Sequence, residues 1–105
     1  MDKHKMKKIT IKLIDKFFSN MVTRKSVINF FTELDRLKCE KIILDFTGIK
    51  FISRSCADEY INLKNKSSKI ISEKNITSEV RDMIDMVASA KGIKQEISLE
   101  FAPTV

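Results

Sequence analysis

Hydrophobic positions near the start of the chain recur first with the period of a strand and then with the period of a helix. Polar and apolar residues alternate over residues 8–13, which predicts a half-buried strand near a sheet edge. Residues 24–38 repeat at helical spacing instead, and Thr23 is placed to cap that predicted helix. The apolar positions of the helix are Val27, Phe30, Phe31, Leu34 and Leu37.

The middle of the chain repeats this succession of strand and helix. Residues 41–46, KIILDF, form a short apolar run that only Asp45 interrupts. Such a run predicts a strand buried on both faces, as in a sheet covered by helices. Gly48 marks a turn after this strand, and residues 53–65 predict a second amphipathic helix.

The last part of the chain predicts two further strands with a helix between them. Residues 69–72, KIIS, predict a short strand, and Thr77 or Ser78 can cap a third helix that reaches Ala90. Residues 96–101, EISLEF, alternate again and predict a final strand.

The predicted order is therefore β–α–β–α–β–α–β, which favours an α/β domain with mostly parallel neighbours. We expect a mixed sheet of about four to five strands with three helices. A chain of 105 residues suits one domain, residues 1–105, in which residues 1–7 form a basic, mobile tail. No apolar run approaches the roughly 18 residues that a membrane span needs, so we expect no membrane contact.

The charge balance leaves two kinds of partner open. The net charge is +6, which suits nucleic acid or an acidic protein surface, but a solvated lysine-rich chain has the same balance. Cys39 and Cys56 are isolated, which indicates reduced thiols in the cytoplasm. With one histidine and no CxxC pair, the pattern of a zinc site is absent.

The residue types that carry enzyme chemistry are sparse in this sequence. Two glycines cannot build a phosphate-binding loop, and neither Ser55 nor Cys56 has a suitable histidine base. The acid pairs Asp58/Glu59 and Asp82/Asp85 are typical of a solvated helix face. Phe46 and Phe51 are expected in the core. We therefore expect a binding module without a cofactor, and not an enzyme.

One segment resembles a known family. Residues 42–60, IILDFTGIKFISRSCADEY, resemble the centre of STAS domains, the fold of anti-sigma factor antagonists. Those domains similarly have an apolar strand, Asp-Leu-Ser-Gly-Val, a short extension, Asp-Ser-Ser-Gly and a helix. The segment, with MVTRKSV before the first helix, looks closest to a divergent STAS-like family of unknown function. Residues 45–49, DFTGI, match the first motif, and residues 53–56, SRSC, stand in place of the second.

The resemblance implies a regulatory protein-interaction module. In partner-switching STAS domains a serine kinase of the histidine-kinase ATPase superfamily phosphorylates the second serine of the motif, which corresponds to Ser55. Another regulator is the alternative partner. A hydroxyl at a helix N-terminus meets unpaired N–H groups, so Ser53 or Ser55 also suits a simple helix cap. Ser53 is the better placed of the two, with Cys56 three residues later. The predicted partner-binding residues are Thr47, Ser53, Arg54, Ser55, Asp58 and Glu59.

Two other binding functions stay open at this stage. The positive charge suits nucleic acid, whose binding would weaken steeply with salt. Open α/β sheets usually bind small ligands such as nucleotides at the carboxyl ends of their strands. The hydroxyls of Thr47, Ser53 and Ser55 would line that edge.

Overall fold

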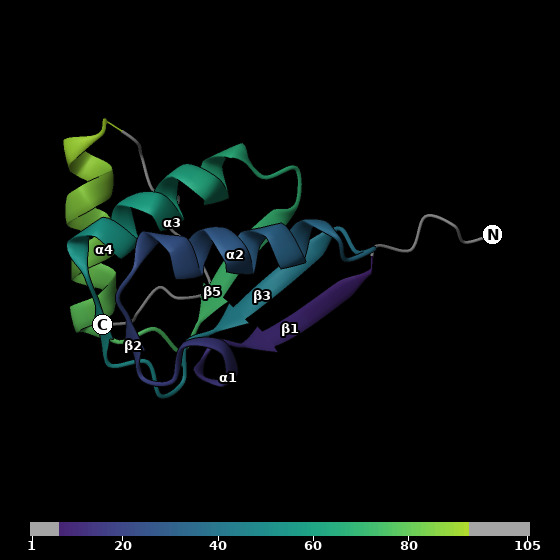
Figure 1. Cartoon of the computed structure of the whole chain (residues 1–105), viewed down its shortest axis with the longest axis horizontal. Coiled ribbons are helices and arrows are strands. Elements are labelled where there is room, and N and C mark those ends of the chain that lie inside the picture. Colours follow the sequence, from purple (N-terminus) through teal and green to yellow (C-terminus); the bar gives the residue numbers. More distant parts are fainter. Residues whose placement is uncertain (1–6, 93–105) are drawn as a thin grey trace, which may run out of the picture.

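Three parallel strands form the main sheet (Figure 1). The computed structural model describes residues 7–92. The strands are β1 (Lys8–Lys12), β3 (Lys41–Asp45) and β5 (Ile70–Lys74), in the order β1-β3-β5. Their register aligns Ile9 with Ile42 and Ile42 with Ile71. The three strands therefore lie side by side in sequence order.

Helices α2 (Arg24–Asp35) and α3 (Arg54–Lys66) lie on one face of this sheet (Figure 1). Helix α2 follows β1, helix α3 follows β3, and α4 (Ser78–Ala90) follows β5. Crossovers between parallel strands are right-handed, so consecutive crossovers along one direction of the sheet place α2 and α3 on the same side. Helix α3 packs between α2 and α4 (Figure 1). The start of α3 is therefore flanked by two other helices.

The core lies between the sheet and these helices. Ile42, Leu44 and Phe46 are fully buried, and Tyr60 of α3 is 1% exposed. Aromatic rings meet edge to face across this core, from Phe31 through Tyr60 to Phe46. Burial of these apolar side chains is the main stabilising contribution to the fold.

The opposite face of the sheet carries no helix among residues 7–92 (Figure 1). Strand β3 was predicted to be buried on both faces, but Ile43, which points to this face, is only partly buried. Ile70 on β5 is 53% exposed. The prediction was wrong because it assumed helices on both sides of the sheet. The remaining side chains on this face are Lys8, Thr10, Lys12, Lys41, Asp45, Ser72 and Lys74, of which Asp45 is buried.

A second, very small sheet lies at the carboxyl end of the main one. Strands β2 (Asn20–Met21) and β4 (Phe51–Ile52) pair in parallel, and the short helix α1 (Ile14–Phe17) precedes β2. The sequence pattern did not predict these three elements. Phe51 was expected in the core but is 48% exposed, because Ile52 is the residue of β4 that turns inward.

The larger elements agree with their predicted positions, apart from one helix end. Helix α2 was expected to reach residue 38 but ends at Asp35. Arg36 N and Leu37 N donate to carbonyls three residues back, and Lys69 Nζ donates to the Leu37 carbonyl at 2.8 Å. These contacts satisfy the last carbonyls of the helix.

Two predictions fall beyond residues 7–92. The N-terminal tail of residues 1–7 lies outside the described residues except for Lys7, and the predicted strand 96–101 lies outside them entirely. Within the described range, no helix has the length and apolar character that crossing a membrane requires.

Candidate functional site

The turn between β3 and β4 is organised by Asp45, which is almost fully buried. Its Oδ1 accepts hydrogen bonds from Thr47 Oγ1 at 2.6 Å, from Thr47 N at 3.0 Å and from Asn75 Nδ2 at 3.0 Å. These bonds, led by that of the Thr47 hydroxyl and followed by that of Asn75, lower the Asp45 pKa to about 2. The Thr47 hydroxyl is thus a structural donor in this turn.

Gly48 completes the turn in a way that a larger residue would disturb. Its φ is +87°, a conformation that favours glycine, and an added Cβ would lie 2.3 Å from Ile14 Cδ1. The backbone therefore passes close to α1 before it enters β4 and then α3.

Ser53 is the cap of α3. Its Oγ accepts a hydrogen bond from Cys56 N at 3.0 Å and donates one to the Val22 carbonyl at 2.6 Å. Thr23 caps α2 and Thr77 caps α4 through the same bond to the amide three residues later. The sequence favoured Ser53 over Ser55 as the cap of α3, and the structure confirms Ser53 in that role.

The hydroxyl of Ser55 is left outside the capping arrangement. Its nearest polar partner in the described part of the chain is Ser53 Oγ at 3.4 Å, a weak contact. Ser53 already donates its proton to the Val22 carbonyl, so Ser55 is the donor in this contact. Ser55 is partly exposed and lies at the second position of α3.

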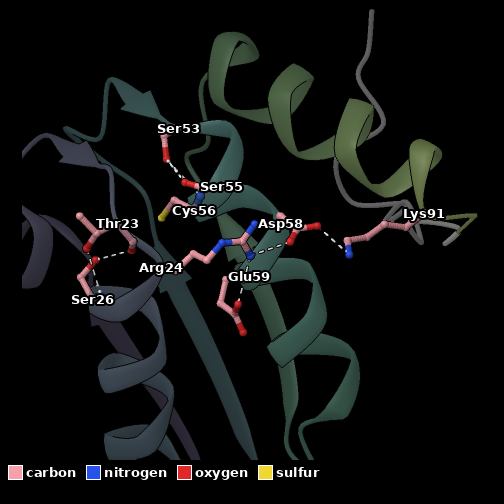
Figure 2. A network of polar contacts seen from close by, with 9 residues as sticks. All are labelled: Thr23, Arg24, Ser26, Ser53, Ser55, Cys56, Asp58, Glu59 and Lys91. Carbon is pink, nitrogen blue, oxygen red and sulfur yellow. Dashed lines mark hydrogen bonds and ion pairs between the residues drawn. The ribbon is translucent and has the colours of Figure 1, made fainter.

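An ion-pair network joins the three long helices beside Ser55 (Figure 2). Arg24 Nη1 of α2 lies 2.7 Å from Asp58 Oδ2 and 3.2 Å from Glu59 Oε1. Lys91 Nζ, just after α4, lies 2.6 Å from Asp58 Oδ1. The Lys91 ammonium and then the Arg24 guanidinium lower the Asp58 pKa, and the two acids raise the pKa of Arg24.

These acids were expected on a solvated helix face, and that expectation was wrong. The side chains of Asp58 and Glu59 are only 26% and 19% exposed, because α2 and the end of α4 approach α3 there. The pair is therefore part of the contact between helices.

The network borders a cleft of about 540 Å³ at the start of α3. Arg54 is exposed at its rim, and no ion pair to Arg54 is found within residues 7–92. Three basic side chains thus stand near two acidic ones, which leaves the cleft with a net positive charge. The lining residues are Arg24, Ser53, Arg54, Ser55, Asp58, Val87, Ala90 and Lys91.

The structure brings most of the predicted partner-binding residues together. Four of them line the cleft: Ser53, Arg54, Ser55 and Asp58. Glu59 is tied to the cleft through Arg24, whereas Thr47 belongs to the turn before β4.

Arg24 and Lys91 were missed in the sequence. No local pattern marks them, because both side chains reach Asp58 from other helices.

The cleft can hold an anionic group by charge and hydrogen bonding. Burial raises the pKa of the Cys56 thiol to about 12, so this neighbour of Ser55 is not a thiolate at neutral pH. No cluster of histidine, cysteine and acidic residues suited to a metal ion is found in residues 7–92.

Comparisons of the whole chain with models of protein families, with curated proteins and with solved structures find no match.

Proposed function

We propose that this protein is a non-enzymatic, STAS-like regulatory module that binds a protein partner through the start of α3, and that phosphorylation of Ser55 switches this binding. The α/β fold with a strand, a turn and a helix at residues 41–66 is compatible with the resemblance at residues 42–60. The resemblance suggests a serine kinase of the histidine-kinase ATPase superfamily, or another regulator, as the partner.

One observation carries the proposal: Ser53 caps α3, so the hydroxyl of Ser55 is not needed as a cap and makes only a weak contact with Ser53. Ser55 nevertheless lies in a cleft that Arg24, Arg54 and Lys91 line with positive charge. Arg54 stands in the first turn of α3, where a cation is unfavourable beside the positive end of the helix dipole. An anion at Ser55 would offset this repulsion.

A phosphoryl group at Ser55 would act on the cleft through charge. It would add about −1.5 to −2 charges at pH 7 and three acceptor oxygens. The free N–H groups at the start of α3 and the Arg54 guanidinium would stabilise it. It would also compete for Arg24 and Lys91 with Asp58, which lies three residues after Ser55 in α3. The surface offered to a partner would thus change in charge and in the arrangement of two basic side chains.

The test combines modification analysis with matched substitutions. The chain is isolated with its bound proteins from cells that make it, and phosphorylated residues are mapped by mass spectrometry. We expect phosphate on Ser55, a partner that remains bound to Ser55→Ala, and at least tenfold weaker binding of that purified partner to Ser55→Asp.

Ser78→Asp is the matched control, because Ser78 is an exposed first-turn serine of another capped helix. The control should bind as the unchanged protein does. An unmodified Ser55 together with equal partner binding by Ser55→Asp and Ser78→Asp would refute the proposal.

A further inference from the structure

Three apolar side chains are exposed around the small sheet next to the start of α3. Phe18 is 81% exposed, and Val22 and Phe51 are each 48% exposed. The Ser19 carbonyl accepts hydrogen bonds from Lys50 N at 2.8 Å and from Phe51 N at 3.3 Å, which holds the two segments together. Phe51 and Val22 share the outer face of the β2–β4 pair, because Phe51 aligns with Asn20 and Val22 follows two residues later.

Phe18 has an unfavourable backbone conformation as well as an exposed ring. Its φ is +59° and its ψ is −132°, a region that bulky residues rarely adopt. Its amide donates to the Ile14 carbonyl at 3.0 Å, a bond that any residue except proline would make. The exposed ring is not part of the core. Glycine would suit the local backbone better, so folding does not explain a phenylalanine here.

The charges around these side chains are mainly basic. Lys16 and Lys50 are close in sequence to Phe18 and Phe51, and Arg54 follows β4. Lys50 and Arg54 make no ion pair with any residue between 7 and 92. Asp15 is the one acidic residue in the segments 14–22 and 47–54. Glu33 of α2 pairs with Lys16 at 3.4 Å, so Lys50 and Arg54 supply the excess positive charge. The complementary partner is therefore acidic as well as apolar.

We propose that Phe18, Val22 and Phe51, here called the β2–β4 surface, bind an acidic segment of a protein partner that carries apolar side chains, with the Phe18 ring as the central anchor. Aromatic anchors dominate many protein interfaces because a few side chains carry most of the binding energy. This inference rests on the proposed function, since it names the chemistry of the partner that docks at the start of α3.

The β2–β4 surface is continuous with the start of α3. Ser53 N donates to the Met21 carbonyl at 2.8 Å, and Ser53 Oγ donates to the Val22 carbonyl at 2.6 Å. The residue that caps α3 therefore also fixes the end of β2. One bound segment can contact the exposed rings and still reach the cleft beside Ser55.

The test uses a displayed library of random peptides of about 16 residues, selected on the full chain. We expect the enriched peptides to combine apolar residues with Asp or Glu. Synthetic copies should bind Phe18→Gly and Phe51→Ser at least tenfold more weakly, measured by calorimetry. Ile70→Ser is the matched control, because Ile70 is 53% exposed on the bare face of the main sheet, and it should bind as the unchanged protein does.

Thermal unfolding separates a binding role from a structural one. Phe18→Gly should unfold at a higher temperature than the unchanged chain, because glycine relieves the backbone strain and no buried contact is lost. Weaker peptide binding by a more stable variant is a result that a structural role of Phe18 would not produce.

The remaining outcomes each bear on the inference. It is overturned if no peptide is enriched, if the enriched peptides are basic, or if they bind Phe18→Gly as well as the unchanged protein. It is also overturned if light scattering shows a dimer that Phe18→Gly abolishes, since the surface then joins two copies of the chain. If the cellular partner binds Ser55→Asp as it binds the unchanged protein but binds Phe18→Gly at least tenfold more weakly, the β2–β4 surface stands and the proposed Ser55 switch has failed.

Discussion

Helices α3 and α4 begin with the same capping bond but lie in different surroundings. Ser53 Oγ accepts from Cys56 N at 3.0 Å, and Thr77 Oγ1 accepts from Val80 N at 3.3 Å. In the first turn of α4, Ser78 and Glu79 are exposed, and Glu79 is an acid that suits the helix dipole. The first turn of α3 has no acid, begins with Arg54 and borders the cleft.

The starts of α3 and α4 have the capping bond in common and differ in the charged residues around it. Both starts share a capping hydroxyl that accepts a hydrogen bond from the amide three residues later. The second hydroxyl and the basic neighbours of α3 add nothing to that bond, and Arg54 is slightly unfavourable beside the helix dipole. Departures from the locally most stable sequence tend to occur at functional sites. The α3 start is therefore the better candidate for binding.

The largest effect is expected from Asp45, which connects the turns before the two helices. Asp45→Ala removes the acceptor of the Thr47 bonds before α3 and of the Asn75 bond before α4. We expect a loss of about 3 kcal/mol of unfolding free energy in urea titrations. Asn75→Gly keeps the positive φ at that position and should cost about 1 kcal/mol. If Asp45→Ala and Asn75→Gly lose the same free energy of unfolding, the two turns are not connected through Asp45.

The same carboxylate predicts a stability that depends on pH. Its pKa is lowered from 3.8 to about 2 in the folded chain, so folding favours the charged form. The stabilisation is complete above about pH 4 and is lost as the pH falls through 2, a decrease of about 2 kcal/mol. Asp45→Asn, measured between pH 2 and pH 6, should lack this component of the decrease.

A smaller difference is expected between the two caps. Ser53→Ala loses the bond from Cys56 N and the bond to the Val22 carbonyl, so it should cost about 2 kcal/mol. Thr77→Ala loses only its capping bond and should cost about 1 kcal/mol. Chemical unfolding of both variants measures this difference, and a larger cost at Thr77 would contradict the stronger anchoring of α3.

The smallest expected effect on stability comes from adding a negative charge to the first turn of α3 or of α4. Ser55→Asp places an acid beside Arg54 at a helix start without one, and it should stabilise the fold by about 0.5 kcal/mol at low salt. Ser78→Asp places an acid beside Glu79, whose negative charge offsets the gain from the helix dipole, so the stability should change by about 0 kcal/mol. Thermal unfolding at low and high salt tests this, because the gain at Ser55 should fade with screening.

Periodicity predicted the larger elements of the fold because their apolar faces pack against one another. The spacing of Val27, Phe30 and Leu34, for example, reflects a helix face that is buried in the structure. Strands β2 and β4 are two residues long, too short to show a period. The sheet face that no helix of residues 7–92 covers was also missed, because the run KIILD does not reveal whether Ile43 packs against a helix.

The candidate site was only partly predictable for a related reason. Ser53, Arg54 and Ser55 are adjacent in sequence, so one motif located them together. Arg24 and Lys91 reach Asp58 from other helices, and their positions depend on how α2 and α4 pack against α3. The sequence gives no local signal for such long-range contacts, nor for the exposure of Phe18.

The order of the strands in the sheet has a consequence for how the chain is assembled during synthesis. Because β1, β3 and β5 adjoin in sequence order, each new strand pairs with the one already made. Likewise α3 packs on α2 and α4 packs on α3, so each helix finds its neighbour among residues that left the ribosome before it. Each new unit therefore closes a loop only to its predecessor, which favours stepwise folding.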